Sequence, residues 1–529
     1  MPSLSTTPSY TSQSTMEKKV EEGRGRAVAA APDSSLPVIG EDELDEGAKL
    51  AGEVAQEFTQ EEKNAVRRKI DRRVVPLLAA VYFLQFWDKN SVNYSSVMGL
   101  PLTGEHYNLV SMAFYIGFLI AEMPQSTLAQ RFPMAKYLGI NILLWGTALF
   151  LHAASGLFAP FFVFRVLLGV FESCVSPILI ALVAAFYRKD EQAKRIGAFY
   201  VCNGITQIVG GAIAYGITKY SGPFDHWRII YLLMGGITVF VGVAVFIWLP
   251  SSPSTAKFLT ENERVIALER VRSNASGTVS HRFKKDQAKE AFTDPKVWGL
   301  VATMAIICVP NAAITSFTSI LIKSFGYTSQ EALLLNMPCG AIAIITTLSV
   351  CWLADAKKLR MIPLLVSVVP SIVGMAILIA YSKNGSHGAH KGPLFVGILL
   401  SQTFVSGIAL LYSWSSTNIG GSTKKAIVNA LMLLAFSGGN LGGTQAFQST
   451  DAPIYLPGKI ALFVLLVLLV PVTLSMHFYV RRLNTKKADE VRRLVEEHGW
   501  SEADLQREKE RLAFADLTDK ANPFYVYLP

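Results

Sequence analysis

Charged residues are scarce in this sequence: Asp, Glu, Lys and Arg make up 17% of the 529 residues, whereas hydrophobic residues make up 51%. The charges gather before Val74, between Pro250 and Pro295, and after Arg481, so the stretches between these points are almost wholly apolar. Soluble globular proteins carry about 25% charged residues. The composition therefore excludes a soluble globular protein and predicts a helical protein that crosses a membrane many times.

Several motifs of other protein classes are missing. The cysteines lie in apolar runs and never form a CxxC pair, so neither a disulfide framework nor a metal site is predicted. No Walker-type glycine loop is present, so ATP is not the expected energy source, and no cofactor is predicted. Residues 1–73 hold no apolar core followed by a small-residue cleavage site, so we expect no removable signal peptide.

Apolar runs long enough to cross a bilayer, which takes about 20 helical residues, recur along the chain. They form two sets of six, separated by the polar residues 250–295. The runs do not alternate with a period of two, so each is predicted to be a helix rather than a membrane strand. The predicted spans are 74–98, 109–130, 137–154, 160–187, 196–218, 229–249, 296–322, 331–354, 361–381, 393–414, 426–447 and 459–480.

Basic residues in the short loops predict which side of the membrane each loop faces. The richer set of loops holds Arg131, Lys136, Arg188, Lys189, Lys194, Arg195, Lys357, Lys358, Arg360, Lys424 and Lys425. We interpret these clusters as signals of orientation rather than as a nucleic-acid surface, and predict that this set and both chain ends are cytoplasmic. The predicted divisions are a mostly disordered cytoplasmic tail (1–73), two six-helix halves (74–249 and 296–482), a cytoplasmic central loop (250–295) and a cytoplasmic tail (483–529).

The two halves repeat one pattern. The second span reads Glu122-Met-Pro and ends near the basic residue Arg131, and the eighth span reads Asn336-Met-Pro and ends near Lys357. Two related six-helix halves are typical of a carrier that rocks about a site between them. The basic loops alone are explained equally well by the general rule that positive charge stays inside.

Acidic and basic residues away from the ends of the predicted spans lie in the first half: Asp88, Lys89, Glu122, Arg165 and Glu172. Each costs about 2.5 kcal/mol or more at mid-bilayer unless it faces a cavity or a partner. Arg165 and Glu172 stand about 10 Å apart along one helix, too far for a direct bond. Asp88 and Lys89 are consecutive and point about 100° apart, so they neutralise each other poorly. We therefore predict a network between the first and fourth spans.

Two interpretations of these charges are open. In the functional one, Arg165 or Lys89 supplies positive charge to a bound anion, and a carboxylate takes and releases a proton. The candidates for that proton site are Glu172, Asp88 and Glu122. In the structural one, the charges form a static network that holds helices together.

Uncharged polar residues also occur within the spans. Asn311 in the seventh span and Asn440 in the eleventh are predicted to contact the substrate, although such amides often only bond a neighbouring helix. Outside the spans, residues 260–272 begin with a sequence typical of a capping box and continue with helical spacing. Residues 481–511 are predicted to form a charged amphipathic helix, and both segments are expected to pack on the cytoplasmic face.

These features resemble the major facilitator superfamily, and within it the fungal anion:cation symporters around the allantoate permeases. The resemblance covers residues 71–527. It is carried, in this order, by Asp88-Lys89, by Gln130-Arg-Phe-Pro133, by Arg165-Val-Leu-Leu-Gly169-Val-Phe-Glu172 and by Leu517-Thr-Asp-Lys-Ala-Asn-Pro523. The sequence departs from the superfamily at Gln130, where an acidic residue is usual, whereas Asp355 keeps that acid after the eighth span.

The resemblance implies an all-α membrane protein with the major facilitator fold, twelve helices in two halves, and no enzymatic activity. It implies a multi-pass plasma-membrane transporter that takes up a small organic anion, such as a ureide, a vitamin or another carboxylate, together with protons. Arg165 then contacts the anion and Glu172 couples the proton. The expected partners are the anion, protons and membrane lipid, with no nucleic acid, and the expected state is a monomer. An exporter of small molecules or toxins and a nutrient receptor that does not transport are the alternatives.

Overall fold

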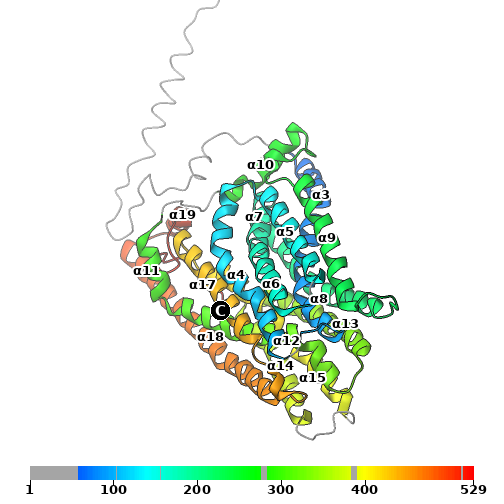
Figure 1. Ribbon diagram of the computed structural model, residues 1–529. Helices are drawn as coiled ribbons and strands as arrows, with labels where there is room; N and C mark the ends of the chain where they lie inside the picture. The colour runs from blue at the N-terminus through cyan, green and yellow to red at the C-terminus, as the bar shows by residue number, and fades with distance from the viewer. Residues whose placement is uncertain (1–57, 103, 155, 276–282, 383–389, 514–515) are drawn as a thin grey trace, which may run out of the picture. The chain divides into compact units, whose positions relative to one another are not determined.

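The computed structural model describes residues 58–529, except 103, 155, 276–282, 383–389 and 514–515. All regular structure within these ranges is helical (Figure 1). Most of the N-terminal tail predicted at 1–73 lies outside the described residues.

The first described helix, α3 (Gln60–Val97), begins earlier than the span predicted at 74–98. Thr59 caps it, because the Thr59 hydroxyl accepts a hydrogen bond from the Glu62 N–H (3.3 Å) while the Glu62 carboxylate accepts one from the Thr59 N–H (3.0 Å). This reciprocal capping box satisfies two of the N–H groups that a helix start leaves unpaired. Residues 60–73 of the predicted tail are therefore helical.

The other helices of the first half follow in chain order. They are α4 (Glu105–Arg131), α5 (Met134–Ala154), α6 (Phe158–Glu172), α7 (Val175–Phe186), α8 (Lys189–Ile217) and α9 (His226–Trp248). The central loop contains a short 3₁₀ turn, η2 (Pro253–Thr255), and the helices α10 (Glu261–Ala275) and α11 (Lys285–Thr293). Thr260 and Glu263 form the predicted capping box at the start of α10, with the Thr260 N–H 2.8 Å from the Glu263 carboxylate.

The second half repeats the arrangement. Its helices are α12 (Pro295–Ser324), α13 (Ser329–Lys357), α14 (Met361–Ser382), α15 (Lys391–Ser401), η4 (Thr403–Val405), α16 (Ser406–Asn418), α17 (Ser422–Gly443), η5 (Ser449–Asp451) and α18 (Leu456–His498), followed by α19 (Glu502–Ala513). Figure 1 shows α10 beside the start of α3, and α11 beside α17, which agrees with their contacts.

Ten helical segments of the described residues are long and apolar enough to cross a membrane. The two predicted spans outside this set are those of α3 and α8, whose shorter apolar part is Val201–Ile217. In α3 the reason is a series of buried polar residues, among them Gln85, Asn90 and Asn93. These side chains face protein rather than lipid, so they lower the hydropathy of the helix without exposing polar groups to the bilayer.

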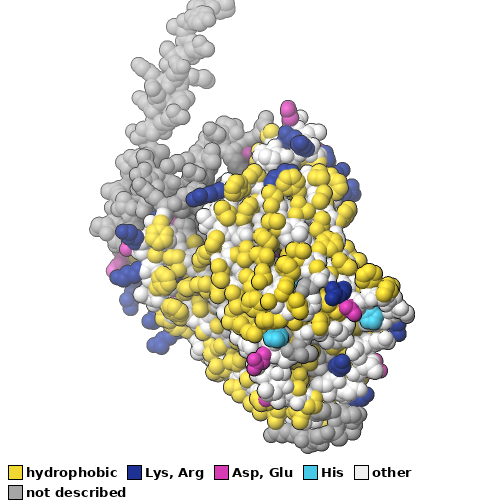
Figure 2. All heavy atoms as spheres, in the orientation of Figure 1, with side chains coloured by type: hydrophobic (Ala, Val, Ile, Leu, Met, Phe, Trp, Pro, Cys, Tyr) yellow, Lys and Arg dark blue, Asp and Glu magenta, His cyan; other side chains and the backbone are white. Residues whose placement is uncertain are grey.

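Large apolar side chains cover much of the outer surface. Ile120, Phe240 and Trp352 are 67%, 70% and 72% exposed, and Figure 2 shows hydrophobic side chains spread over the middle of the visible face. A soluble protein rarely exposes apolar area on this scale. The chain is therefore a multi-pass membrane protein whose exposed apolar side chains face lipid.

Buried apolar residues form two cores. One runs from Val66 to Ala267 and the other from Ala291 to Tyr527, with a few residues, such as Ala312 in the first, crossing between them. The first core includes a close contact between α4 and α6, where a Cβ on Gly169 would lie 2.1 Å from the Phe114 carbonyl oxygen. Only glycine permits this approach.

The exact domain boundaries and the cytoplasmic side remain predictions.

Some predicted helices are divided in the structure. The fourth span is divided into α6 and α7 directly after Glu172. Pro177 supplies the reason, because it has no N–H for the carbonyl of Ser173. The segment predicted as one helix at 481–511 is helical over 481–498 and 502–511, but it is not one separate helix. Its first part continues α18 from the membrane span to His498, and Gly499, at φ 60°, ends α18 in the left-handed conformation that favours glycine.

Candidate functional site

Two ion pairs join α3 to α6. The Lys89 ammonium lies 3.2 Å from Glu172 Oε1, and Arg165 Nη1 lies 3.4 Å from Asp88 Oδ1. The predicted network between the first and fourth spans is therefore confirmed. Consecutive residues of α3 point in different directions, so each meets a different turn of α6, and residues seven apart on α6 each find a partner on α3.

The pair of Arg165 and Asp88 is enclosed within the first half. Arg165 Nη2 donates to Ser91 Oγ (2.7 Å) and to the Tyr231 hydroxyl (3.3 Å). Trp145 Nε1 donates to Asp88 Oδ2 (3.0 Å). Four helices, α3, α5, α6 and α9, thus hold one buried pair, and additional hydrogen bonds of this kind are what makes such a pair tolerable in an apolar interior.

The pair of Lys89 and Glu172 has different surroundings. The side chain of Glu172 is fully buried, whereas that of Lys89 remains 14% exposed. The Lys89 ammonium lies 5.3, 5.5 and 5.9 Å from the ring centroids of Phe86, Phe114 and Phe118, which is within cation–π range. Phe118 in turn meets Phe436 of α17, with centroids 6.4 Å apart. Lys89 therefore lies at the border between the two halves.

Glu122 lies on α4 and is almost fully buried. Its Oε1 atom has no hydrogen-bond partner among the described residues. The structure therefore does not bring Glu122 into either ion pair, and its predicted role in proton coupling stays a prediction.

Asn311 and Asn440, the predicted contacts of the second half, lie together. Asn311 Nδ2 donates to Asn440 Oδ1 (2.8 Å), and Asn440 Nδ2 donates to the Phe436 carbonyl (2.7 Å). Pro310 lies inside α12 beside Asn311. The amides are thus joined to each other across α12 and α17, and their contact with a substrate remains a prediction.

Sequence reasoning missed Trp145, Tyr231 and Ser91, which complete the surroundings of Asp88 and Arg165. A buried Trp or Tyr normally places its N–H or O–H on a partner. The positions of Trp145 and Tyr231 within apolar spans therefore indicated that each meets a polar partner, but the sequence does not reveal which polar group that is.

Hydrogen bonds between the halves occur near the start of α4. The Tyr107 hydroxyl donates to the Ser316 carbonyl (2.5 Å), and Asn108 Nδ2 donates to the Phe447 carbonyl (2.9 Å). The Ser319 N–H donates to Asn93 Oδ1 (2.8 Å). Side chains of the first half thus bind the backbone of the second half at the end of the bundle that the loops predict to be external.

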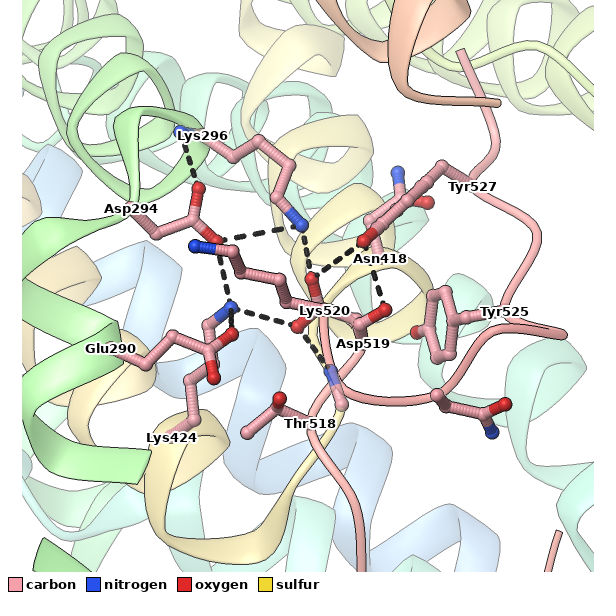
Figure 3. A network of polar contacts seen from close by, with 12 residues as sticks. Glu290, Asp294, Lys296, Asn418, Lys424, Thr518, Asp519, Lys520, Tyr525 and Tyr527 are labelled. Carbon is pink, nitrogen blue, oxygen red and sulfur yellow. Dashed lines mark hydrogen bonds and ion pairs between the residues drawn. The ribbon is translucent and has the colours of Figure 1, made fainter. Parts of the chain in front are cut away.

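Three carboxylates at the other end, those of Glu290, Asp294 and Asp519, lie close enough to one another to hold a cation. The Lys424 ammonium lies 2.8, 2.7 and 2.9 Å from them and occupies the position that a metal would take (Figure 3). This cluster is therefore an ion-pair network.

Comparison with known proteins gives the class. The sequence profile described as Major Facilitator Superfamily matches residues 78–445. The chain is 35% identical over 499 residues to the allantoate permease of Saccharomyces cerevisiae, covering 92% of this chain and 90% of that protein. It is 32% identical over 510 residues to a thiamine pathway transporter of the same yeast, covering 94% of each. The fold is similar to that of a xylose transporter from E. coli, with a TM-score of 0.58 at 13% identity, covering 77% of this chain and 99% of that one.

The fold and these matches define a membrane transporter, not an enzyme. The chain belongs to the major facilitator superfamily. Its substrates are therefore small molecules, and the helices of its described residues have the fold of that superfamily.

Proposed function

We propose that this transporter takes up a small organic anion together with protons across the plasma membrane. The observation that carries the proposal is the ion pair of Lys89 and Glu172, in which a partly exposed ammonium faces a fully buried carboxylate at the border of the two halves. The similarity to an allantoate permease supports a carboxylate as the substrate class.

In this proposal the anion and Glu172 compete for one ammonium. When Glu172 is ionised, Lys89 is already paired. When Glu172 takes up a proton, the Lys89 charge becomes available to the carboxylate of the substrate. The empty site (Lys89 positive, Glu172 negative) and the loaded site (Lys89 positive, substrate negative, Glu172 protonated) both have zero net charge. A site with only the proton or only the anion is charged, and reorienting a charge through a low-dielectric interior is costly. Because only the neutral states reorient readily, movement of the anion is coupled to movement of the proton.

Arg165 has a supporting role in this mechanism. The guanidinium is bound by Asp88, Ser91 and Tyr231 and is almost fully buried, so it positions α3 against α6. A direct contact of Arg165 with the anion would require it to leave Asp88. On the opposite side, the amides of Asn311 and Asn440 offer hydrogen bonds to the polar groups of the substrate.

The test is uptake of a panel of labelled carboxylates, allantoate included, by cells that express the protein, at two external pH values. We expect more accumulation at the lower pH. Lys89→Gln should abolish accumulation of the substrate. Lys323→Gln, which removes an exposed lysine, is the matched control and should leave accumulation unchanged. Faster loss of preloaded substrate instead of uptake would identify an exporter, and binding without either would identify a receptor.

The double variant Lys89→Gln with Glu172→Gln separates function from scaffolding. A static ion pair can be replaced by a neutral pair with little loss. If the ammonium binds the substrate, the double variant stays inactive although it reaches the membrane. Recovery of uptake in the double variant would show that the pair only holds α3 and α6 together.

A further inference from the structure

The segment 516–529 at the C-terminal end lies against the second half, with Asp519 at its centre. Asp519 is fully buried, and its Oδ1 lies 2.9 Å from the Lys424 ammonium. Its Oδ2 contacts the Lys296 ammonium and accepts a hydrogen bond from the Tyr527 hydroxyl (3.0 Å; Figure 3). The carboxylate is thus held by two cations from α12 and α17.

The rest of the segment is held through its backbone. Asn418 Nδ2 donates to the Leu528 carbonyl (2.8 Å), and the Leu528 N–H donates to Asn418 Oδ1 (2.7 Å). Asn484 of α18 exchanges the same two bonds with Tyr527 (2.8 and 2.9 Å). Two amide side chains therefore recognise the extended backbone in the way that a neighbouring strand would.

The segment also reaches the turn between α13 and α14, because the Arg360 N–H donates to the Pro529 carbonyl (2.7 Å). Closer to α19, the Ser422 N–H donates to Asp516 Oδ1 (2.7 Å). One stretch of chain thus ties together the neighbouring ends of α12, α13, α16 and α17 and the part of α18 around Asn484. The motif that begins at Leu517 in the sequence forms part of this stretch.

The first half contains a matching cluster. Glu191 at the start of α8 lies 2.7 Å from Arg270 Nη2 of α10 and 3.4 Å from Arg67 Nη1 of α3. Here too one carboxylate lies between two cations. The three residues again come from the first helix of the half, from its fifth span and from the segment that follows its sixth.

Two of the three positions carry opposite charges in the two clusters. The fifth span of the first half supplies the carboxylate of Glu191, and that of the second half supplies the ammonium of Lys424. The following segment supplies a cation, Arg270, in the first half and the anion, Asp519, in the second. The ion pairs of Glu191 and of Asp519 each join parts of one half, so a rocking motion between the halves leaves them intact.

We propose that α10 and the segment 516–529 act as two braces on the predicted cytoplasmic side. Each brace holds together the cytoplasmic ends, called the inner ends below, of the helices of its own half, so that the half moves as one rigid body during transport. Asp519 and Glu191 are the positioning residues of these braces. Rocking of one half against the other requires that the helices within each half keep their arrangement. The proposal needs no assumption about the substrate or about protons.

Hydrogen–deuterium exchange of the full chain in lipid nanodiscs tests the braces without a substrate. Asp519→Asn should raise exchange at the inner ends of α12 and α17 and in 516–529 by about tenfold, and should leave α3, α8 and α10 unchanged. Glu191→Gln should raise exchange in α3, α8 and α10 and should leave α12, α17 and 516–529 unchanged. Lys520→Gln, which changes an exposed charge next to Asp519, is the control and should change neither half. Unchanged exchange, or a rise spread over both halves, would overturn the proposal.

Uptake of labelled allantoate adds a functional measurement. Asp519→Asn should lower the maximal rate about tenfold while the half-saturating concentration stays within about twofold, and Asp519→Glu should restore part of the rate. If Asp519→Asn, Asp519→Glu and Glu191→Gln all leave no folded protein in the membrane, the clusters serve folding alone and the proposal is wrong. Absence of allantoate uptake by the unaltered chain would bear on the proposed substrate and leave the exchange measurement to decide.

Discussion

The Lys89 ammonium and the Glu172 carboxylate lie 3.2 Å apart at the last residue of α6, directly before the chain divides into α7. The neighbouring pair of Asp88 and Arg165 is bound by further side chains, whereas Lys89 is surrounded by aromatic rings and remains partly exposed. A ligand can therefore separate Lys89 from Glu172 at a lower free-energy cost than Asp88 from Arg165, because fewer hydrogen bonds must break.

Glu172→Gln should uncouple transport from protons. The amide imitates the protonated carboxyl group, so the site can reorient with its anion in the absence of a proton gradient. We expect proton-driven accumulation to disappear while exchange of labelled for unlabelled substrate persists, measured in vesicles with and without a pH difference. Continued pH-dependent accumulation would move the proton site to Asp88 or Glu122.

Arg165→Ala should nearly eliminate transport, and Arg165→Lys should weaken it, because a lysine keeps the charge but loses the planar fork that binds Asp88 and Ser91 together. Removing one partner of a buried pair costs about 3–5 kcal/mol of stability. The amount of folded protein should therefore fall with Arg165→Ala.

The double variant Arg165→Gln with Asp88→Asn distinguishes the two roles of Arg165. Fluorescence-detected chromatography should find the folded protein restored, since no buried charge is left unpaired. Uptake that returns together with folding would assign Arg165 to positioning. Uptake that stays absent would assign it to the anion.

Tyr107→Phe should favour the conformation that is open at the predicted external end. The change removes the hydroxyl that donates to the Ser316 carbonyl, and a hydrogen bond of this kind contributes about 0.5–1.5 kcal/mol. The open population should rise by up to about tenfold.

The measurement for Tyr107→Phe is labelling of Asn311→Cys by an impermeant thiol reagent from outside, after the five native cysteines have been replaced. Tyr220→Phe, an exposed tyrosine in the same half, is the control and should leave the labelling rate unchanged. An unchanged rate in Tyr107→Phe would show that this hydrogen bond does not close the external end.

Docking of the C-terminal segment should be insensitive to pH between about 5 and 8. Burial alone would raise the pKa of Asp519, but the Lys296 and Lys424 ammonium groups, with the hydrogen bonds they donate, lower this pKa below its ordinary value. A carboxyl group whose folded pKa is lowered stabilises the fold above its unfolded pKa, and this contribution is lost only as the pH falls through the folded value. Proteolysis of the C-terminal segment across this range should proceed at one rate, and faster cleavage near pH 5 would contradict the assignment.

The sequence by itself determined the class of this protein. Runs of about 20 apolar residues can be satisfied only as membrane helices, because a bilayer offers no partners for backbone hydrogen bonds. Charges as rare as Asp88, Lys89, Arg165 and Glu172 within such runs must find partners, and their spacing predicted that these lie on different helices.

Only the tertiary structure decided which charges meet. The rotation of α3 against α6 pairs Lys89 with Glu172, and the close approach of α4 and α6 at Gly169 sets the distance between the helices around it. Asp519 meets Lys424 from 95 residues away, which no local pattern encodes. Charge and hydropathy are properties of single residues and can be read along a chain, whereas an ion pair depends on how helices pack, and that is settled by the many side chains between them.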